Sequence, residues 1–217
     1  MKIRFGFMLM AFFTMMISCK KDSVIDTADR VGISKVTYYP TITLKGDAIV
    51  TVPNGDVYTE PGVSATAGSS DVPVRTAGLV DTGKDGVYTI TYSAKNVDGY
   101  SSVASRTVVV YTTAPDAVAH DLSGTYLRPA TGSSAVWTKI APGVYEVFNP
   151  GGSPGTNLTV VVFNPSVFNI MIPPQLGSDG SPTSSTNESY TNSNPATYSW
   201  KIVNPGYGGA LRTFIKQ

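Results

Sequence analysis

Residues 88–94, with the sequence YTITYSA, alternate large apolar side chains with small ones that are mostly polar. A β-strand with one buried face has this period of two, because successive side chains point to opposite faces of the sheet. Residues 106–111, RTVVVY, carry an unbroken run of β-branched side chains, which predicts a strand buried on both faces. Together the two stretches indicate a β-fold.

Turn sequences punctuate the chain around these strands, and each combines glycine with proline, asparagine or aspartate. They are residues 53–56 (PNGD), 60–62 (EPG), 84–86 (KDG) and 97–99 (VDG). These residue types adopt the backbone angles that tight turns need. Short strands at this spacing over residues 36–112 predict a small immunoglobulin-like β-sandwich.

Composition changes after a linker that we place at residues 113–120. Between residues 115 and 217 only ten side chains are charged, whereas thirty are Ser, Thr or Asn. Strands are predicted at residues 124–128, 135–140, 144–148, 158–163, 167–172, 197–203 and 211–216. Tight hairpins at 141–143 and 164–166 favour an antiparallel meander over residues 121–217, closed as a small barrel or sandwich. The predicted fold class is therefore all-β throughout.

The amino-terminal segment looks like an export signal. Lys2 and Arg4 precede thirteen uncharged, mainly apolar residues at 5–17. A membrane-spanning helix needs about 20 such residues, so residues 1–18 are predicted to be a signal peptide. Residues 19–35 are charged and lack apolar periodicity, which predicts a flexible tether.

Residues 16–19, MISC, resemble the lipobox of bacterial lipoproteins. The resemblance implies that Cys19 is lipidated and anchors the mature chain to a membrane. The charged residues 20–23, KKDS, resemble the surface-export signals of Bacteroides-type lipoproteins. We therefore expect a protein of the outer membrane that faces the cell exterior, with retention on the periplasmic face as the alternative.

Both folded regions also resemble known families. Residues 58–65, YTEPGVSA, with residues 78–82 and 86–92, resemble the bacterial immunoglobulin-like repeats of surface proteins. Such modules are spacers or recognition platforms, so the resemblance implies a fold and no activity. Residues 123–126, 143–145, 173–175 and 204–208 resemble the carboxy-terminal domain of an uncharacterised family of Bacteroides-type lipoproteins, some of which belong to glycan-utilisation loci.

The inventory of side chains argues against several classes of function. One cysteine and one histidine leave no Cys/His metal cluster and no disulfide, and a net charge of +1 argues against nucleic acid as a partner. In the second region Glu146 is the one carboxylate predicted on a strand, whereas a glycosidase needs two. A serine nucleophile would need a base, and His120, the one histidine, falls in the linker. We expect no catalytic residues, no metal and no cofactor.

Aromatic rings are the remaining means of recognition, because flat rings stack on sugars while hydroxyls and amides fix orientation. Tyr198 and Trp200 share a face with Ile202 and are expected in the core. Trp137 shares its face with Lys139 and is expected to be exposed. Residues 177–197 are predicted to be a polar loop that carries Tyr190, and residues 204–209 a flexible turn that carries Tyr207. We expect Trp137, Tyr190 and Tyr207 to form a carbohydrate contact surface.

The sequence therefore predicts a non-catalytic cell-surface lipoprotein that binds glycan for a polysaccharide-uptake system. Its expected partners are the membrane, through the lipid on Cys19, polysaccharide, and outer-membrane uptake proteins. The alternative is a structural or adhesive module whose carboxy-terminal β-domain binds a protein.

Overall fold

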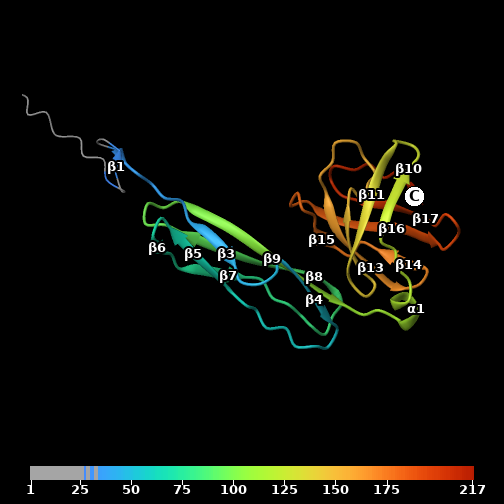
Figure 1. The fold of residues 1–217 in the computed structure, drawn as a ribbon, viewed down its shortest axis with the longest axis horizontal. Helices are drawn as coiled ribbons and strands as arrows, with labels where there is room; N and C mark the ends of the chain where they lie inside the picture. Colours follow the sequence, from blue (N-terminus) through green and yellow to red (C-terminus); the bar gives the residue numbers. More distant parts are fainter. Residues whose placement is uncertain (1–26, 28–29, 32–33) are drawn as a thin grey trace, which may run out of the picture. The chain divides into compact units, whose positions relative to one another are not determined.

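The computed structural model of the chain describes residues 27, 30–31 and 34–217 (Figure 1). Residues Tyr38–Gln217 form one compact unit. A short antiparallel pair, β1 Arg30–Val31 and β2 Ser34–Lys35, precedes it. The predicted signal peptide, Cys19 and most of the tether lie outside the described residues. In the described part of the chain, no helix is long and apolar enough to cross a membrane.

The first part of the compact unit is a pair of β-sheets. One sheet contains β3 Thr41–Leu44, β5 Val63–Ala67 and β6 Ser70–Asp71. The other contains β4 Ile49–Pro53, β9 Ser101–Tyr111, β8 Gly86–Lys95 and β7 Val74–Ala77, in that spatial order. β4 pairs with β9 in parallel, and the other pairs are antiparallel. The predicted immunoglobulin-like sandwich is confirmed.

Residues 108–110, near the end of strand β9, are buried on both faces, as the apolar run of residues 106–111 predicts. Val108 and Val110 point into the sandwich core with Ile90 and Tyr92 of β8. Val109 points the other way and is equally buried, in a second apolar cluster that includes residues of the carboxy-terminal sheet. Both faces of one strand therefore contribute to apolar packing.

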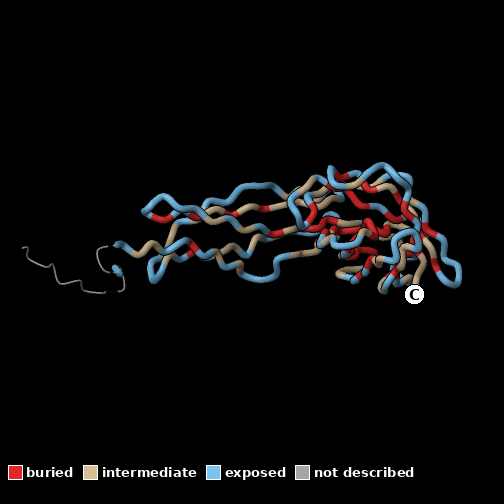
Figure 2. Tube along the Cα trace, turned by 90° about the horizontal axis from the view of Figure 1, so that it is seen from above, coloured by how far each residue is buried: buried red, intermediate tan, exposed pale blue. Residues whose placement is uncertain are grey.

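The second part is a nine-stranded antiparallel sheet. Its strands are β10 Gly124–Arg128, β11 Ser133–Ala141, β12 Val144–Phe148, β13 Thr159–Ser166, β14 Asn169–Met171, β15 Gln175–Leu176, β16 Pro182–Thr191, β17 Thr197–Val203 and β18 Arg212–Lys216. Their spatial order is β14-β13-β12-β11-β10-β18-β17-β16-β15. The sheet curls into a half-barrel whose inner face holds an aromatic-rich core, and the buried residues run along its strands in Figure 2. The all-β prediction is confirmed for this part too.

The two ends of the curled sheet are joined by side chains as well as by backbone. The Ser185 backbone N–H donates to the Ile172 carbonyl at 3.1 Å, and the Ile172 N–H donates to the Ser185 hydroxyl at 2.7 Å. Gln175 uses its amide on Val161, accepting from the Val161 N–H and donating to the Val161 carbonyl, both at 2.7 Å. This side chain pairs with β13 as a neighbouring strand would, which satisfies backbone groups that an edge strand leaves open.

The predicted linker is ordered by hydrogen bonds to the half-barrel. It contains the helical turn α1 Pro115–Val118, in which Ala117 is fully buried. The Thr113 hydroxyl donates to the Pro142 carbonyl at 2.7 Å, and the Ala114 N–H donates to the Pro165 carbonyl at 2.9 Å.

Two local predictions are wrong. The hairpin placed at residues 164–166 turns instead at 167–168, because β13 continues to Ser166. The polar loop predicted at 177–197 contains β16, which pairs with β17 along most of its length. Among its Ser, Thr and Asn side chains, Thr183 and Tyr190 are buried, and a register shift between Thr186 and Ser189 interrupts the alternation between them.

Candidate binding site

The predicted exposed position of Trp137 is wrong. Its side chain is 2% exposed, its indole Nε1–H donates to the Tyr198 hydroxyl at 3.1 Å, and its ring stacks on Trp200 with centroids 5.7 Å apart. Ala135 and Trp137 point into the half-barrel, and Val136 points out. The alternation argument failed because it took Lys139 as a guide, and Lys139 lies where the register of β11 shifts. Trp200 is buried in the core, as predicted.

Tyr190 and Tyr207 also serve packing. Tyr190 is buried in the half-barrel core, opposite Tyr198 across the β16–β17 pair. Tyr207 packs against the same core from its edge, shares a hydrogen bond with the Thr156 hydroxyl at 3.1 Å, and lies 5.0 Å below the Arg212 guanidinium. Trp137, Tyr190 and Tyr207 therefore form no common exposed surface.

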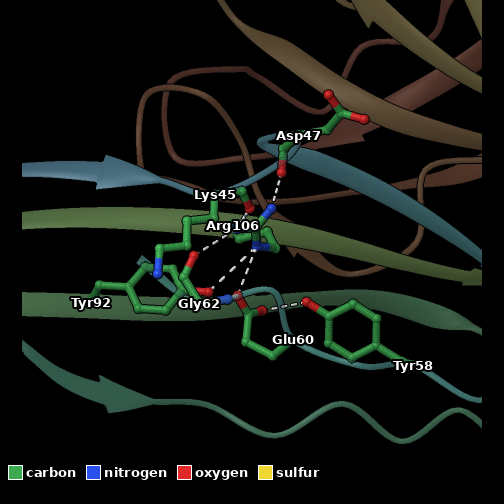
Figure 3. A network of polar contacts seen from close by, with 7 residues as sticks. All are labelled: Lys45, Asp47, Tyr58, Glu60, Gly62, Tyr92 and Arg106. Atoms are coloured by element: carbon green, nitrogen blue, oxygen red, sulfur yellow. Dashed lines mark hydrogen bonds and ion pairs between the residues drawn. The ribbon is translucent and has the colours of Figure 1, made fainter. Parts of the chain in front are cut away.

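A buried polar cluster in the sandwich explains its signature residues YTEPGV (Figure 3). Arg106 of β9 has no exposed surface, and its guanidinium donates to the carbonyls of Lys45 at 2.7 Å and of Asp47. Its Nε–H donates to the Glu60 carboxylate at 3.2 Å. The same carboxylate accepts the Gly62 N–H at 2.8 Å and the Tyr58 hydroxyl. These bonds hold two loops against β9.

The electrostatics of the cluster agree with a structural role. Burial alone would raise the pKa of Glu60, but hydrogen bonds from Tyr58, Tyr92 and Gly62 and the charge of Arg106 lower it below its ordinary value. Burial, together with the hydrogen bond to Glu60, raises the pKa of Tyr58. Glu60 is thus an anion fully occupied by its neighbours, and it has no oxygen directed at a ligand.

A groove of about 290 Å³ is a better candidate for binding. Thr89 of β8 and Ser105 and Thr107 of β9 line one side. Glu146 of β12 and Thr159 of β13 line the other, together with the turn that follows β15. The four-stranded sheet of the sandwich and the nine-stranded sheet therefore both contribute to one groove.

An apolar cluster beside the groove fixes its walls relative to one another. Val109 of β9 packs there with Val144 of β12 and with Val161 and Phe163 of β13. Val161 lines the groove and belongs to this cluster as well. Strand β13 is buried on both faces for this reason, since Val160 and Val162 fill the half-barrel core.

Glu146 is the one carboxylate among the residues that line the groove. It points away from the half-barrel core, because its neighbours Tyr145 and Val147 point inward. The side chain is half-buried, and within residues 34–217 its carboxylate has no hydrogen bond or ion pair. A partly desolvated carboxylate without donors is costly, so a ligand that supplies donors gains free energy there.

Phe148 lies two residues beyond Glu146 on the same outer face of β12. Its ring is 44% exposed, and its register partners are Val136 on β11 and the groove residue Thr159 on β13. An exposed ring thus flanks the groove beside Glu146 and Thr159, although it is not itself among the lining residues. Sequence reasoning missed Phe148 because it weighed only tryptophan and tyrosine, although the alternation of residues 144–148 places it on the outer face.

A second hollow, also about 290 Å³, lies at the rim of the half-barrel and contains His120, Asp121 and Lys216. Hydrogen bonds from Ser123 lower the pKa of Asp121. Among the described residues, no three His, Cys, Asp or Glu side chains come together as a metal site would require. The Asp179 and Glu188 carboxylates, predicted to lie in a loop, accept bonds from Ser181 at 2.9 Å and Ser185 at 2.6 Å, and Glu188 is on β16.

Comparisons with known proteins agree with this architecture. Residues 42–110 match the model of the family described as bacterial surface protein, Ig-like domain. A similar solved structure is that of the lipoprotein BT2262 from Bacteroides thetaiotaomicron, at 23% identity and a TM-score of 0.40, covering 82% of this chain and 100% of that one. No curated protein matches the chain. The immunoglobulin-like resemblance of the first folded region is confirmed by the family match.

Proposed function

We propose that this protein is a non-catalytic lipoprotein that captures glycan at the groove between β9 and β12. In this proposal Cys19 carries the lipid, the outer membrane holds the anchor, and the folded part faces the cell exterior. Captured glycan passes to outer-membrane uptake proteins. The lipobox resemblance and the match to a bacterial surface domain support the location.

The observation that carries the proposal is the exposed Phe148 ring beside the unpaired Glu146 carboxylate. A sugar ring presents an apolar face that stacks on an aromatic side chain and hydroxyls that bond polar groups at its edge. Phe148 offers the platform, and Glu146 accepts hydroxyl protons. The open hydroxyls of the groove extend the polar contact beyond one sugar unit.

The acidic groups near this site favour binding over hydrolysis. Glycoside hydrolysis uses two carboxyl groups about 5–9.5 Å apart. Among the residues that line the groove, Glu146 is the one carboxylate. A lone carboxylate orients a sugar without supplying the acid and base pair that cleavage needs.

A glycan array probed with the mature chain tests the proposal. We expect saturable binding to one polysaccharide class, weakened about tenfold or more by Phe148→Ala, because the stacked apolar contact is lost. Phe168→Ala is the matched control, since that ring is 63% exposed but stands in the turn between β13 and β14, whereas Phe148 is the register partner of the groove residue Thr159. The control should bind like the wild type.

Silence of the wild-type chain on the array would contradict glycan capture and favour the structural or adhesive alternative. An equal loss of glycan binding in Phe148→Ala and Phe168→Ala would contradict the assignment of the binding site to the groove. Binding by the wild type with full retention in Phe148→Ala would do the same.

A further inference from the structure

We infer that the groove selects glycans without negative charge and rejects acidic ones, such as chains that carry uronate or sulfate. This rests on the proposed function, because it specifies the ligand class of the same groove. The observation is the charge of the lining: one carboxylate and no lysine, arginine or histidine.

The lone carboxylate is the first reason for this selectivity. Glu146 has no cation and no hydrogen-bond donor among residues 34–217 to neutralise it. Asp179 adds a second negative charge in the turn between Ser178 and Gly180, both of which line the groove. An acidic sugar would therefore bring like charges together in a partly desolvated space.

The uncommitted hydrogen-bonding groups are the second reason. The Gln175 amide is hydrogen-bonded to the backbone of Val161 and Pro173, and the Ser178 hydroxyl is hydrogen-bonded to the backbone of Thr159 and Asn157. The hydroxyls of Thr89, Ser105 and Thr107 have no such bond within residues 34–217, and they line the facing wall. A neutral sugar can satisfy all of these groups. Its hydroxyls donate to the Glu146 carboxylate, and they both donate to and accept from the hydroxyls on the facing wall.

We expect the affinity for a neutral glycan to exceed that for its acidic counterpart about tenfold. The repulsion energy of two like charges roughly 6 Å apart, in a partly solvated site, corresponds to about a tenfold change in affinity. Because solvent reaches the groove, added salt should reduce the difference. Rejection by an unpaired like charge is a common source of specificity.

Titration calorimetry with a matched pair of ligands tests the inference. The pair is the neutral oligosaccharide that binds best on the array and the same oligosaccharide with its primary hydroxyls oxidised to carboxylates. We expect the wild-type chain to bind the oxidised form about tenfold more weakly. Glu146→Gln should narrow this ratio to about threefold or less, because it removes the charge and keeps the shape. Glu188→Gln, whose carboxylate does not line the groove, should leave the ratio unchanged.

Equal or tighter binding of the oxidised ligand by the wild type would overturn the inference and leave glycan capture standing. An unchanged ratio of the two affinities, neutral to oxidised, in Glu146→Gln would also overturn the inference. Failure of every glycan to bind would overturn the inference together with the proposed function.

Discussion

Arg106 shows how a signature residue of the sandwich acts through structure. Its guanidinium is buried among carbonyl oxygens and one carboxylate, so each of its three nitrogens donates to at least one oxygen. Burying such a charge is unfavourable by itself, and it is tolerated only when the bonds are complete. The Glu60-Pro61-Gly62 turn is therefore specified by the arginine that it receives.

Removal of this arginine should be strongly destabilising. Arg106→Ala leaves Glu60 and two carbonyls without their donor, and breaking a buried pair of this kind costs about 3–5 kcal/mol. The free energy of unfolding in urea measures it. Arg75→Ala, an exposed arginine on β7, is the control and should change the same quantity by about 0.5 kcal/mol or less. Similar values for the two variants would contradict the structural role of the cluster.

Acid should lower the free energy of unfolding of the sandwich, because it protonates Glu60. The pKa of Glu60 is lowered in the folded state from an ordinary value of 4.5, so the unfolded chain binds the proton more readily. The stabilisation is thus fully present above pH 4.5 and is lost as pH falls through the lower, folded pKa. Denaturant midpoints measured across this range should fall more steeply for the wild type than for Glu60→Gln. Parallel curves would show that Glu60 does not contribute.

At the scale of elements, strands β9 and β13 show what can be predicted from sequence. The unbroken apolar run of β9 predicts burial on both faces, and residues 108–110 are buried. For β13 the sequence predicts a strand, and residues 160–163 prove to be buried in the same way. Which surface covers the second face was not predictable, because the two runs lie more than fifty residues apart and meet only in the folded chain. Strand β16 was missed for a different reason, since its polar side chains lack the hydrophobic contrast on which period-two reasoning depends.

The edge of β13 gives a prediction at the same scale. Gln175→Leu removes both amide bonds to Val161 and leaves a backbone N–H and carbonyl unpaired, which costs about 1–3 kcal/mol. Amide hydrogen exchange should report it as faster exchange at Val161, with little change at Val109 on β9. Gln217→Leu, at the exposed carboxy-terminal residue, serves as the control. Unchanged protection at Val161 would contradict the pairing role of Gln175.

At the scale of the whole molecule, the compact unit of residues 38–217 places the groove where the four-stranded sheet and the nine-stranded sheet both contribute side chains. The all-β class, the sandwich and most strands of the half-barrel could be predicted, because each depends on local alternation and turns. The groove could not, because its lining combines residues from Ile49 to Gly180. The aromatic prediction failed for a related reason: large rings with polar tips fill this core, and Trp137, Tyr190 and Tyr198 meet in it.

The central claim is that ligand binds at the groove and not at the rings of the half-barrel core. Backbone amide shifts of the isotope-labelled mature chain, followed during titration with a neutral glycan that binds on the array, test it most directly. We predict that the largest shifts occur at Glu146, Phe148 and Thr159 and extend to Thr107 across the groove, while the amides of Trp137 and Tyr190 change little. Shifts that cluster around Tyr207, or that leave Glu146 and Phe148 unaffected at saturation, would contradict the account.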